Sequence, residues 1–259
     1  MEMTDRDSLL AIRRYVRSDL PLLRRFGRAL TGSRQLADMC VVQLMNDVID
    51  SPEIVGTSRN PRVALYKHFV GTLKALSQEP EVESALAVVQ SASRQVQLLV
   101  SVEGFSRHEA AEILNVSEQE VNSMLAAAAD GCLTGNASIL VIEDEPLISM
   151  QLEQLISELG HRVLGIAATR RQASKLMKAN VPDLVLSDAQ LADGSSGIEA
   201  VNDVLALRDV PVIYITAFPE RLLTGRRGEP NFLISKPFDA QAVKAIIGQA
   251  LFLKFQAQS

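Results

Sequence analysis

The first part of the chain carries apolar side chains at intervals of three and four residues, which is the spacing of amphipathic helices. The pattern is clear at residues 36–48 and predicts helices at 9–15, 21–30, 35–49 and 61–76. An acidic connector that contains Pro80 follows at residues 77–85. Residues 76–133 are again helical in pattern. The N-terminal half is therefore expected to be entirely helical.

The period changes after a second linker, residues 131–137, which holds two glycines. Short apolar runs rich in β-branched residues now alternate with amphipathic stretches. The runs predict strands at residues 138–143, 162–168, 183–187, 210–216 and 231–235, and the stretches predict helices at 146–159, 170–179, 197–207 and 239–255. Such alternation predicts a parallel sheet covered on both faces. Five strands in about 120 residues fit a flavodoxin-like, doubly wound domain.

The two changes of pattern divide the chain into three predicted modules. The first two are helical, at residues 1–76 and 84–131, and the third is an α/β domain at residues 137–257. The predicted fold class is an all-α part of two helical modules followed by a flavodoxin-like domain with a five-stranded parallel sheet. A chain of 259 residues that is 47% hydrophobic can bury cores of this kind.

Charge and composition exclude several classes of function. The net charge of −5 argues against a general nucleic-acid binder, and the absence of Trp argues against stacking on single strands. The two cysteines, Cys40 and Cys132, are too few for a disulfide framework and do not form a metal-ligand pair. We find no signal peptide and no apolar run long enough to span a bilayer. We therefore expect a cytoplasmic protein with reduced thiols.

Polar residues follow the predicted strands where each of them ends. Glu143 and Asp144 follow the first strand, Asp188 the third, Thr216 ends the fourth, and Lys236 follows the fifth. The carboxyl ends of parallel strands meet at one edge of the sheet, where ligands gather. Three carboxylates cannot all stay ionised at close range without a cation, and hard oxygen ligands suit Mg²⁺. The pattern predicts a magnesium site beside a carboxylate nucleophile.

Together these residues could carry out phosphoryl transfer to a carboxylate. Asp188 would attack a phosphoryl group and form an acyl phosphate. Lys236 and Mg²⁺ would neutralise charge on the transferring oxygens, and the hydroxyl of Thr216 would donate a hydrogen bond to the new phosphoryl group. Taken singly, each residue has an ordinary alternative: a turn or cap residue, a strand residue or a solvated lysine. The combination points to phosphoryl transfer.

Residues 137–257 resemble the receiver domain of two-component response regulators. The resemblance implies that Asp188 is the phosphoacceptor, Thr216 the hydroxyl switch, and Lys236 the lysine of a Lys-Pro signature with a cis bond to Pro237. It implies that Glu143, Asp144 and Asp188, with the backbone carbonyl of Gln190, hold Mg²⁺. A receiver that no longer takes phosphate is the alternative.

Two features depart from the usual receiver pattern. The acidic pair is Glu-Asp where Asp-Asp is commoner, which moves the metal slightly. Leu233 stands at the usual position of an aromatic switch residue, and aromatic residues instead flank Thr216 as Tyr214 and Phe218. The segment 217–225 after the fourth strand is expected to carry the change to the output surface, by a route that differs from the usual one.

The second helical module contains two successive capping boxes. Ser106 with Glu109 and Ser117 with Glu120 each mark a helix start, and the short turn between them predicts a helix-turn-helix. The module resembles region 4 of extracytoplasmic-function sigma factors, and the first module resembles region 2. However, no Lys or Arg occurs between His108 and His161. A DNA reader needs such cations against phosphates, so no direct DNA binding is expected.

A sigma-like part followed by a receiver resembles the PhyR family of general stress response regulators over essentially the whole chain. The resemblance implies an anti-anti-sigma factor: phosphorylation of Asp188 by a sensor histidine kinase releases the sigma-like part to bind a NepR-type anti-sigma factor, which frees a stress sigma factor. It implies no enzyme activity beyond self-phosphorylation and self-dephosphorylation. A DNA-binding response regulator, a receiver-gated sigma factor and a generic helical output domain are the alternatives.

Two surfaces are candidates for contact with the partner. The acidic helix at residues 118–130 is one. The basic residues of the first module are expected to form a solvated face, and contact with an acidic surface of a partner or of the receiver is the functional alternative: Arg13, Arg14, Arg17, Arg24, Arg25 and Arg28.

Overall fold

The computed structural model describes residues 5–56, 58–76, 91–131, 136–191, 196–206, 210–223 and 230–256. The chain forms two compact units, Met1–Ala127 and Ala128–Ser259. The predicted connector at residues 77–85 lies outside the described residues, as do Cys132, most of the second linker and the end of the predicted 217–225 segment. We consider each unit by itself.

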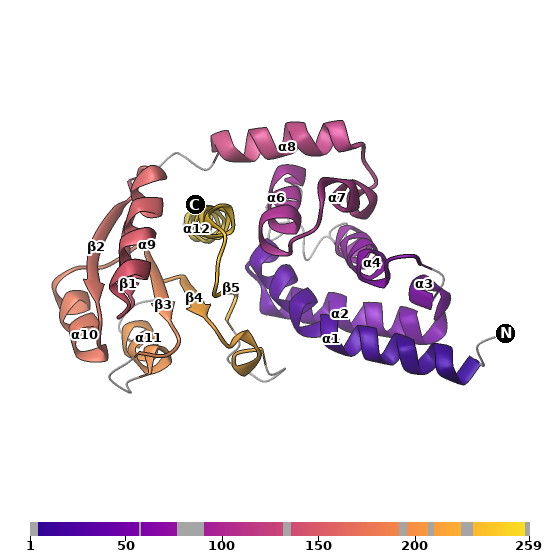
Figure 1. The fold of residues 1–259 in the computed structure, drawn as a ribbon, viewed down its shortest axis with the longest axis horizontal. Helices are drawn as coiled ribbons and strands as arrows, with labels where there is room; N and C mark the ends of the chain where they lie inside the picture. The colour runs from indigo at the N-terminus through magenta and orange to yellow at the C-terminus, as the bar shows by residue number, and fades with distance from the viewer. Residues whose placement is uncertain are drawn as a thin grey trace. The chain divides into compact units, whose positions relative to one another are not determined.

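The first unit is helical, as predicted (Figure 1). Its elements are α1 (Asp5–Thr31), α2 (Arg34–Asp50), α3 (Glu53–Gly56), α4 (Pro61–Leu76), α6 (Ala92–Gln97), the π-helix η1 (Leu98–Val102), α7 (Arg107–Leu114) and α8 (Glu118–Gly131). We refer to α1–α4 as the first bundle and to α6–α8, including η1, as the second bundle. The helix α8 runs across the boundary between the two units.

The prediction of two separate helices at residues 9–15 and 21–30 was wrong. Both stretches belong to α1, and Pro21 lies inside that helix. A proline in a helix interior removes one backbone hydrogen bond and usually kinks or ends the helix. Here the turns after it bury Leu23, Phe26 and Leu30 completely or nearly so. This tertiary packing outweighs the local preference of proline.

Aromatic rings form the centre of the first bundle. The ring of Phe26 lies 5.3 Å from that of Tyr66 and 6.0 Å from that of Phe69, measured between centroids. A Cβ atom at Gly27 would lie 2.7 Å from the ring of Phe69 and 2.9 Å from the Cβ of Ala37. Because real Cβ atoms do not approach so closely, glycine is required where α1 meets α2 and α4.

The predicted helix-turn-helix is present as α7 and α8. Ser106 and Glu109 form a complete capping box, and Glu120 bonds the backbone and hydroxyl of Ser117 in the same way. Asn115 closes α7 in the left-handed conformation, with a φ of 56°. Hydrophobic residues of both helices are buried, among them Ile113 of α7 and Val121 of α8. The two caps therefore fix both helix starts, as the sequence predicted.

The prediction of a solvated basic face was wrong for two of its arginines. Arg25 is 7% exposed and donates to Glu103, and Arg28 is 2% exposed and donates to Asp38. A buried guanidinium needs a carboxylate partner, and helical periodicity does not reveal a partner far along the chain. The side chains of Arg13, Arg14 and Arg17 lie outside what the structure describes.

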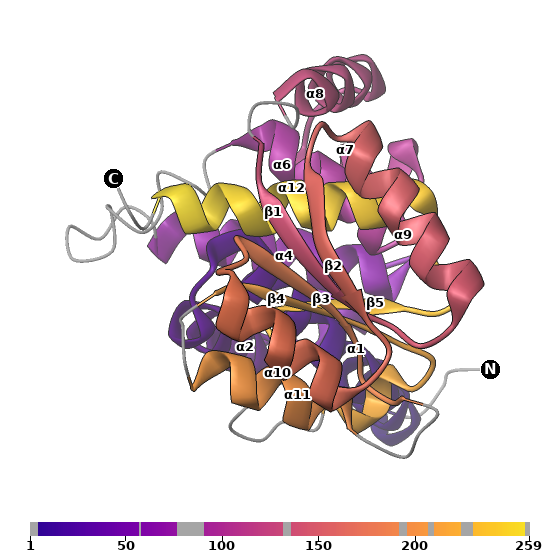
Figure 2. The same ribbon diagram turned by 90° about the vertical axis from the view of Figure 1, so that its left-hand side faces the viewer.

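The second unit has the predicted five-stranded parallel sheet, in the order β2-β1-β3-β4-β5. Its strands are β1 (Ser138–Ile142), β2 (Arg162–Ala167), β3 (Leu184–Asp188), β4 (Val212–Thr216) and β5 (Phe232–Ser235). Its helices are α9 (Pro146–Glu158), α10 (Arg170–Ala179), α11 (Gly197–Leu205), the short 3-10 helix η2 (Pro219–Arg221) and α12 (Ala240–Gln256). Figure 2 shows α10 and α11 together on one face of the sheet and α9 with α12 on the other. This order of strands is the flavodoxin-like order.

The central strands are buried along their whole length, and every residue of β1 and β3 is buried. This is expected for a parallel sheet covered on both faces. No helix in the described part of the chain combines the length and the apolar character needed to cross a membrane.

Candidate functional site

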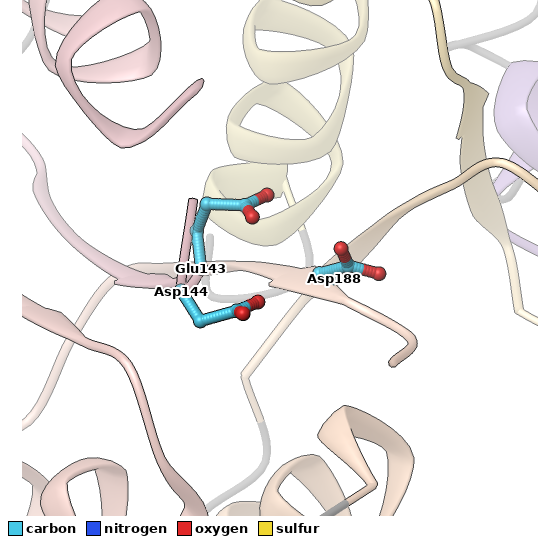
Figure 3. Close-up of side chains that lie close together, drawn as sticks. All are labelled: Glu143, Asp144 and Asp188. Atoms are coloured by element: carbon cyan, nitrogen blue, oxygen red, sulfur yellow. The ribbon is translucent and has the colours of Figure 1, made fainter. Parts of the chain in front are cut away.

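Three carboxylates meet at the carboxyl edge of the sheet. Glu143 and Asp144 directly follow β1, and Asp188 is the last residue of β3. The two strands are neighbours, so the side chains converge: one carboxylate oxygen of each residue lies within 4.8 Å of the others. Figure 3 shows Glu143 and Asp144 extending from adjacent positions toward the side on which Asp188 lies. The sequence correctly predicted that these residues gather.

The ammonium group of Lys236 joins this cluster from β5. Its Nζ donates to Asp188 Oδ2 at 2.8 Å, to Glu143 Oε2 at 3.0 Å and to Glu145 Oε1 at 3.2 Å. The Lys236–Pro237 bond is cis, and the backbone N–H of Lys236 donates to the carbonyl of Thr216 at 2.7 Å. The contact with Glu145 was not predicted. The signal for it in the sequence is a third acidic residue immediately after Glu143 and Asp144.

Burial and hydrogen bonding shift the pKa values of Glu143 and Lys236. Glu143 is only 2% exposed, and burial raises its pKa, although the hydrogen bond from Lys236 partly opposes the rise. Burial lowers the pKa of Lys236, but the hydrogen bonds to Asp188 and Glu143 raise it by more, so the net shift is upward. The lysine is therefore a fixed cation at neutral pH.

Close backbone packing shapes the loop that carries Asp188. The backbone N–H of Gln190 donates to Asp188 Oδ1 at 2.9 Å, and the hydroxyl of Ser187 donates to the carbonyl of Asp188 at 2.9 Å. A Cβ atom at Gly197 would overlap the same carbonyl. Only glycine can therefore begin α11 against this loop, a requirement that the sequence analysis did not foresee.

Thr216 ends β4, beside the strand of Asp188 and the strand that leads to Lys236. It is 2% exposed, and its Oγ1 accepts a hydrogen bond from the backbone N–H of Phe218 at 3.1 Å. Next to it is a pocket of about 360 Å³, lined by Ala189, Gln190, Leu191, Ser196, Ile198, Thr216, Phe218, Arg221 and Leu222. The hydroxyl thus lies at a hollow that the loop after Asp188 also lines.

The aromatic residues around Thr216 differ in exposure. Tyr214 is opposite Leu233 in the sheet, and both are buried; burial raises the pKa of Tyr214 to about 12. Phe218 is 43% exposed, and the guanidinium of Arg221 lies 4.5 Å from its ring centroid. Of the two aromatic residues that flank Thr216, Phe218 is therefore the exposed one and Tyr214 the buried one.

The donor set suits a small divalent cation. It consists of carboxylate oxygens within reach of one another, and such hard oxygen ligands with room for waters are what Mg²⁺ prefers. The same edge of the sheet offers a carboxylate, a buried hydroxyl and a fixed ammonium group. This combination can form and stabilise an acyl phosphate.

The chain matches three protein families in succession. Residues 16–70 match the sigma2 domain of PhyR, residues 86–131 match the sigma-like domain of the response regulator PhyR, and residues 139–248 match the response regulator receiver domain. The chain is also 44% identical to the phyllosphere-induced regulator PhyR of Methylorubrum extorquens, over 92% of this chain and 94% of that protein.

Two solved structures are similar to this chain over nearly its whole length. The response regulator PhyR from Brucella abortus is 44% identical, with a TM-score of 0.84 over 95% of this chain and 96% of the other. The anti-anti-sigma factor PhyR from Bartonella quintana is 42% identical, with a TM-score of 0.84 over 95% and 98%. On this evidence the chain belongs to the PhyR family of response regulators.

Proposed function

We propose that this chain is a phosphorylation-activated anti-anti-sigma factor of a general stress response. Phosphorylation of Asp188 releases the sigma-like part, which sequesters an anti-sigma factor and so frees a stress sigma factor. The observation that carries the proposal is the contact of Asp188 with Lys236, in a chain that is similar over nearly its whole length to proteins of this kind.

We assign the roles at the site from its geometry. Asp188 is the phosphoacceptor: a carboxylate oxygen bonds to phosphorus while the donor's phosphorus–nitrogen bond breaks, and the released imidazole takes a proton from solvent. Lys236 holds a positive charge beside the phosphoryl oxygens. The Thr216 hydroxyl turns from the Phe218 N–H toward the new group. The backbone around Ser187 and Gly197 keeps the acceptor loop in place.

A magnesium site fits the same residues. Glu143, Asp144 and Asp188 supply carboxylate oxygens, and the backbone carbonyl of Gln190 is the fourth protein group that we assign to it. Bound Mg²⁺ would supply charge neutralisation on the phosphoryl oxygens. The ends of β1 and β3 bring these carboxylates together.

The partners follow from the family. The relative from Bartonella quintana has been crystallised in complex with the anti-sigma factor NepR. We assign an anti-sigma factor of the NepR type as the partner of this chain and a sensor histidine kinase as its phosphodonor. We further propose a cytoplasmic location, and no enzyme activity beyond the chain's own phosphorylation and dephosphorylation.

We propose three functional modules: a sigma region 2-like module at residues 1–76, a sigma region 4-like module at 84–131 and the receiver at 137–257. The second module does not suit direct DNA binding, because the exposed residues at the start of α8 are acidic or neutral: Glu118, Gln119, Glu120, Asn122 and Ser123. The acidic side chains would repel phosphates, and the neutral ones would release no counterions. The surface suits recognition by a protein.

Phosphorylation of Asp188 changes the relative free energies of two states of the chain, one in which the sigma-like part is held back and one in which it is released. A change from about 1% to about 99% active requires about 5.5 kcal/mol of differential interaction. The phosphoryl group and the anti-sigma factor can share this energy, because each favours the released state.

Release of the sigma factor tests the proposal. The purified chain is added to a preformed complex of the stress sigma factor with its anti-sigma factor, with and without acetyl phosphate. We expect release only with the phosphodonor, and none with Asp188→Asn under either condition. Salt-sensitive binding of the chain to duplex DNA, with no release, would contradict the proposal and favour a DNA-binding regulator.

A further inference from the structure

The first unit contains a buried charge cluster that connects its two bundles. Glu103 lies at the end of η1 in the second bundle and is 5% exposed. Its Oε1 accepts from Arg25 of α1 at 2.9 Å, and its Oε2 accepts from the hydroxyl of Tyr66 of α4 at 2.7 Å. Arg62 of α4 donates to the backbone carbonyl of Glu103 at 2.8 Å. We call Arg25, Arg62, Tyr66 and Glu103 the interlock.

Aromatic contacts reinforce the interlock across the same boundary. The guanidinium of Arg62 lies 4.3 Å from the ring centroid of Phe105, which belongs to the second bundle. The Phe105 ring packs edge-on against Tyr66, with centroids 4.8 Å apart. Nearby, Asn60 donates to Glu109 Oε1 at 2.8 Å, and Glu109 also caps α7. The cap of the helix-turn-helix is therefore anchored to the first bundle.

The interlock fixes one geometry more strongly than an apolar contact would. The two oxygens of Glu103 have different partners on different helices, so a rotation of the second bundle would break at least one bond. Each broken bond would leave a buried charge or hydroxyl without its partner, which is strongly unfavourable. Burial and the nearby Glu103 carboxylate also raise the pKa of the Tyr66 hydroxyl, which stays a hydrogen-bond donor.

We propose that the interlock holds the two bundles in one fixed relation, so that they present a single preassembled surface to the anti-sigma factor. Phosphorylation then exposes this surface and does not assemble it. The second part of the proposal rests on the proposed function; the first part concerns the sigma-like unit alone. A partner that contacts both bundles at once pays no ordering cost on a preassembled surface.

The experiment uses the full chain with beryllofluoride and Mg²⁺ as the phosphoryl mimic. Glu103→Gln removes the charge at nearly constant shape and takes from the buried Arg25 the carboxylate with which it pairs. Spin labels at Lys67→Cys and Gln119→Cys, both exposed, report the distance between the bundles. Cys132 is replaced by Ser in every variant, and Cys40 is fully buried. The affinity for a NepR-type anti-sigma factor is measured on the same proteins without labels.

We expect Glu103→Gln to broaden the distance distribution and to weaken binding by about tenfold or more, because the competent arrangement is then only a minor population. Asp38→Asn is the matched control. It removes a carboxylate that pairs with Arg24 and Arg28, entirely within the first bundle. This control should change neither the distance distribution nor the affinity.

Several results would overturn the proposal. A narrow distance distribution in Glu103→Gln would show that other contacts hold the bundles, and a broad one with unchanged affinity would show that preassembly is unimportant. If that variant fails to fold, Tyr66→Phe removes one hydrogen bond only; unchanged distances and affinity in Tyr66→Phe would then decide against the interlock. If even the unmodified chain does not bind the anti-sigma factor, the proposed function fails, while the distances still decide whether the bundles are held together.

Discussion

The Nζ of Lys236, directly after β5, lies 2.8 Å from Oδ2 of Asp188 at the end of β3. The two residues are 48 positions apart in the chain. The contact exists because parallel strands end at a common edge. It places a fixed cation beside the proposed phosphoacceptor, and the first prediction concerns that cation.

Lys236→Met should slow phosphorylation of Asp188 by about 100-fold, the order of effect expected when one charge-stabilising group is removed. The measurement is incorporation of label from acetyl phosphate. Lys254→Met is the matched control, because the side chains of both lysines are 12% exposed and both bond an aspartate. Lys254 pairs with Asp183, which precedes β3, so its loss should lower stability and leave phosphorylation unchanged.

Gly197→Ala should disturb the phosphoacceptor loop, because the new Cβ would overlap the carbonyl of Asp188. We expect slower phosphorylation and a lower midpoint of thermal unfolding. Gly71→Ala, inside α4, is the control: outside the backbone of α4, no atom of the described residues lies within 4 Å of the added Cβ, and the change should stabilise the chain by about 0.5–1 kcal/mol. If Gly197→Ala were phosphorylated at the rate of the unmodified chain, the prediction would be wrong and the loop after Asp188 would tolerate the displacement.

The stability of the second unit should depend on pH through Asp183. Burial raises the pKa of this carboxyl, but the hydrogen bonds from Lys254 and from the N–H of Ser138 lower it by more, so it lies below the usual 3.8. The pair therefore stabilises the fold above about pH 4, and the contribution is lost as the pH falls through the folded-state pKa.

Urea unfolding of Asp183→Asn at several pH values checks this prediction. The destabilisation relative to the unmodified chain should be about 0.5–1 kcal/mol at pH 7, since the carboxyl is partly exposed. It should shrink below pH 4. A difference that stayed constant down to pH 3 would mean that the charge of Asp183 does not contribute.

Cys40 should report unfolding of the first bundle. Its side chain is 0% exposed, and burial raises the pKa of the thiol to about 12. The native thiol is therefore protonated at pH 8 and closed to the reagent, and it becomes reactive only when the bundle unfolds. In a Cys132→Ser chain, reaction with a thiol reagent should therefore follow the denaturant-induced unfolding curve. Rapid labelling of the native chain would contradict the buried position.

The sequence predicted the sheet and its functional edge well, for a physical reason. Strand alternation sets the topology, and topology alone brings Asp144, Asp188 and Lys236 together. The contact of Lys236 with Glu145 was not predicted, since it depends on where the side chains point after the strands end. The assigned roles of these residues stay predictions until the phosphorylation experiments are done.

The helical unit was harder to predict in detail. Pro21 lies inside α1 because the packing of the whole helix outweighs a local preference. Arg25 is buried because of Glu103, which is 78 residues away along the chain. No periodicity links such distant positions, so a one-dimensional pattern identified the helices and missed the ion pairs that join them.

The central claim is that phosphorylation of Asp188 controls access to an anti-sigma factor. The most direct test is the affinity of the full chain for a NepR-type anti-sigma factor, measured with and without beryllofluoride and Mg²⁺, for the unmodified chain and for Asp188→Asn. We predict strong tightening with the mimic in the unmodified chain and none in Asp188→Asn. Equal affinity in all four measurements would contradict the claim.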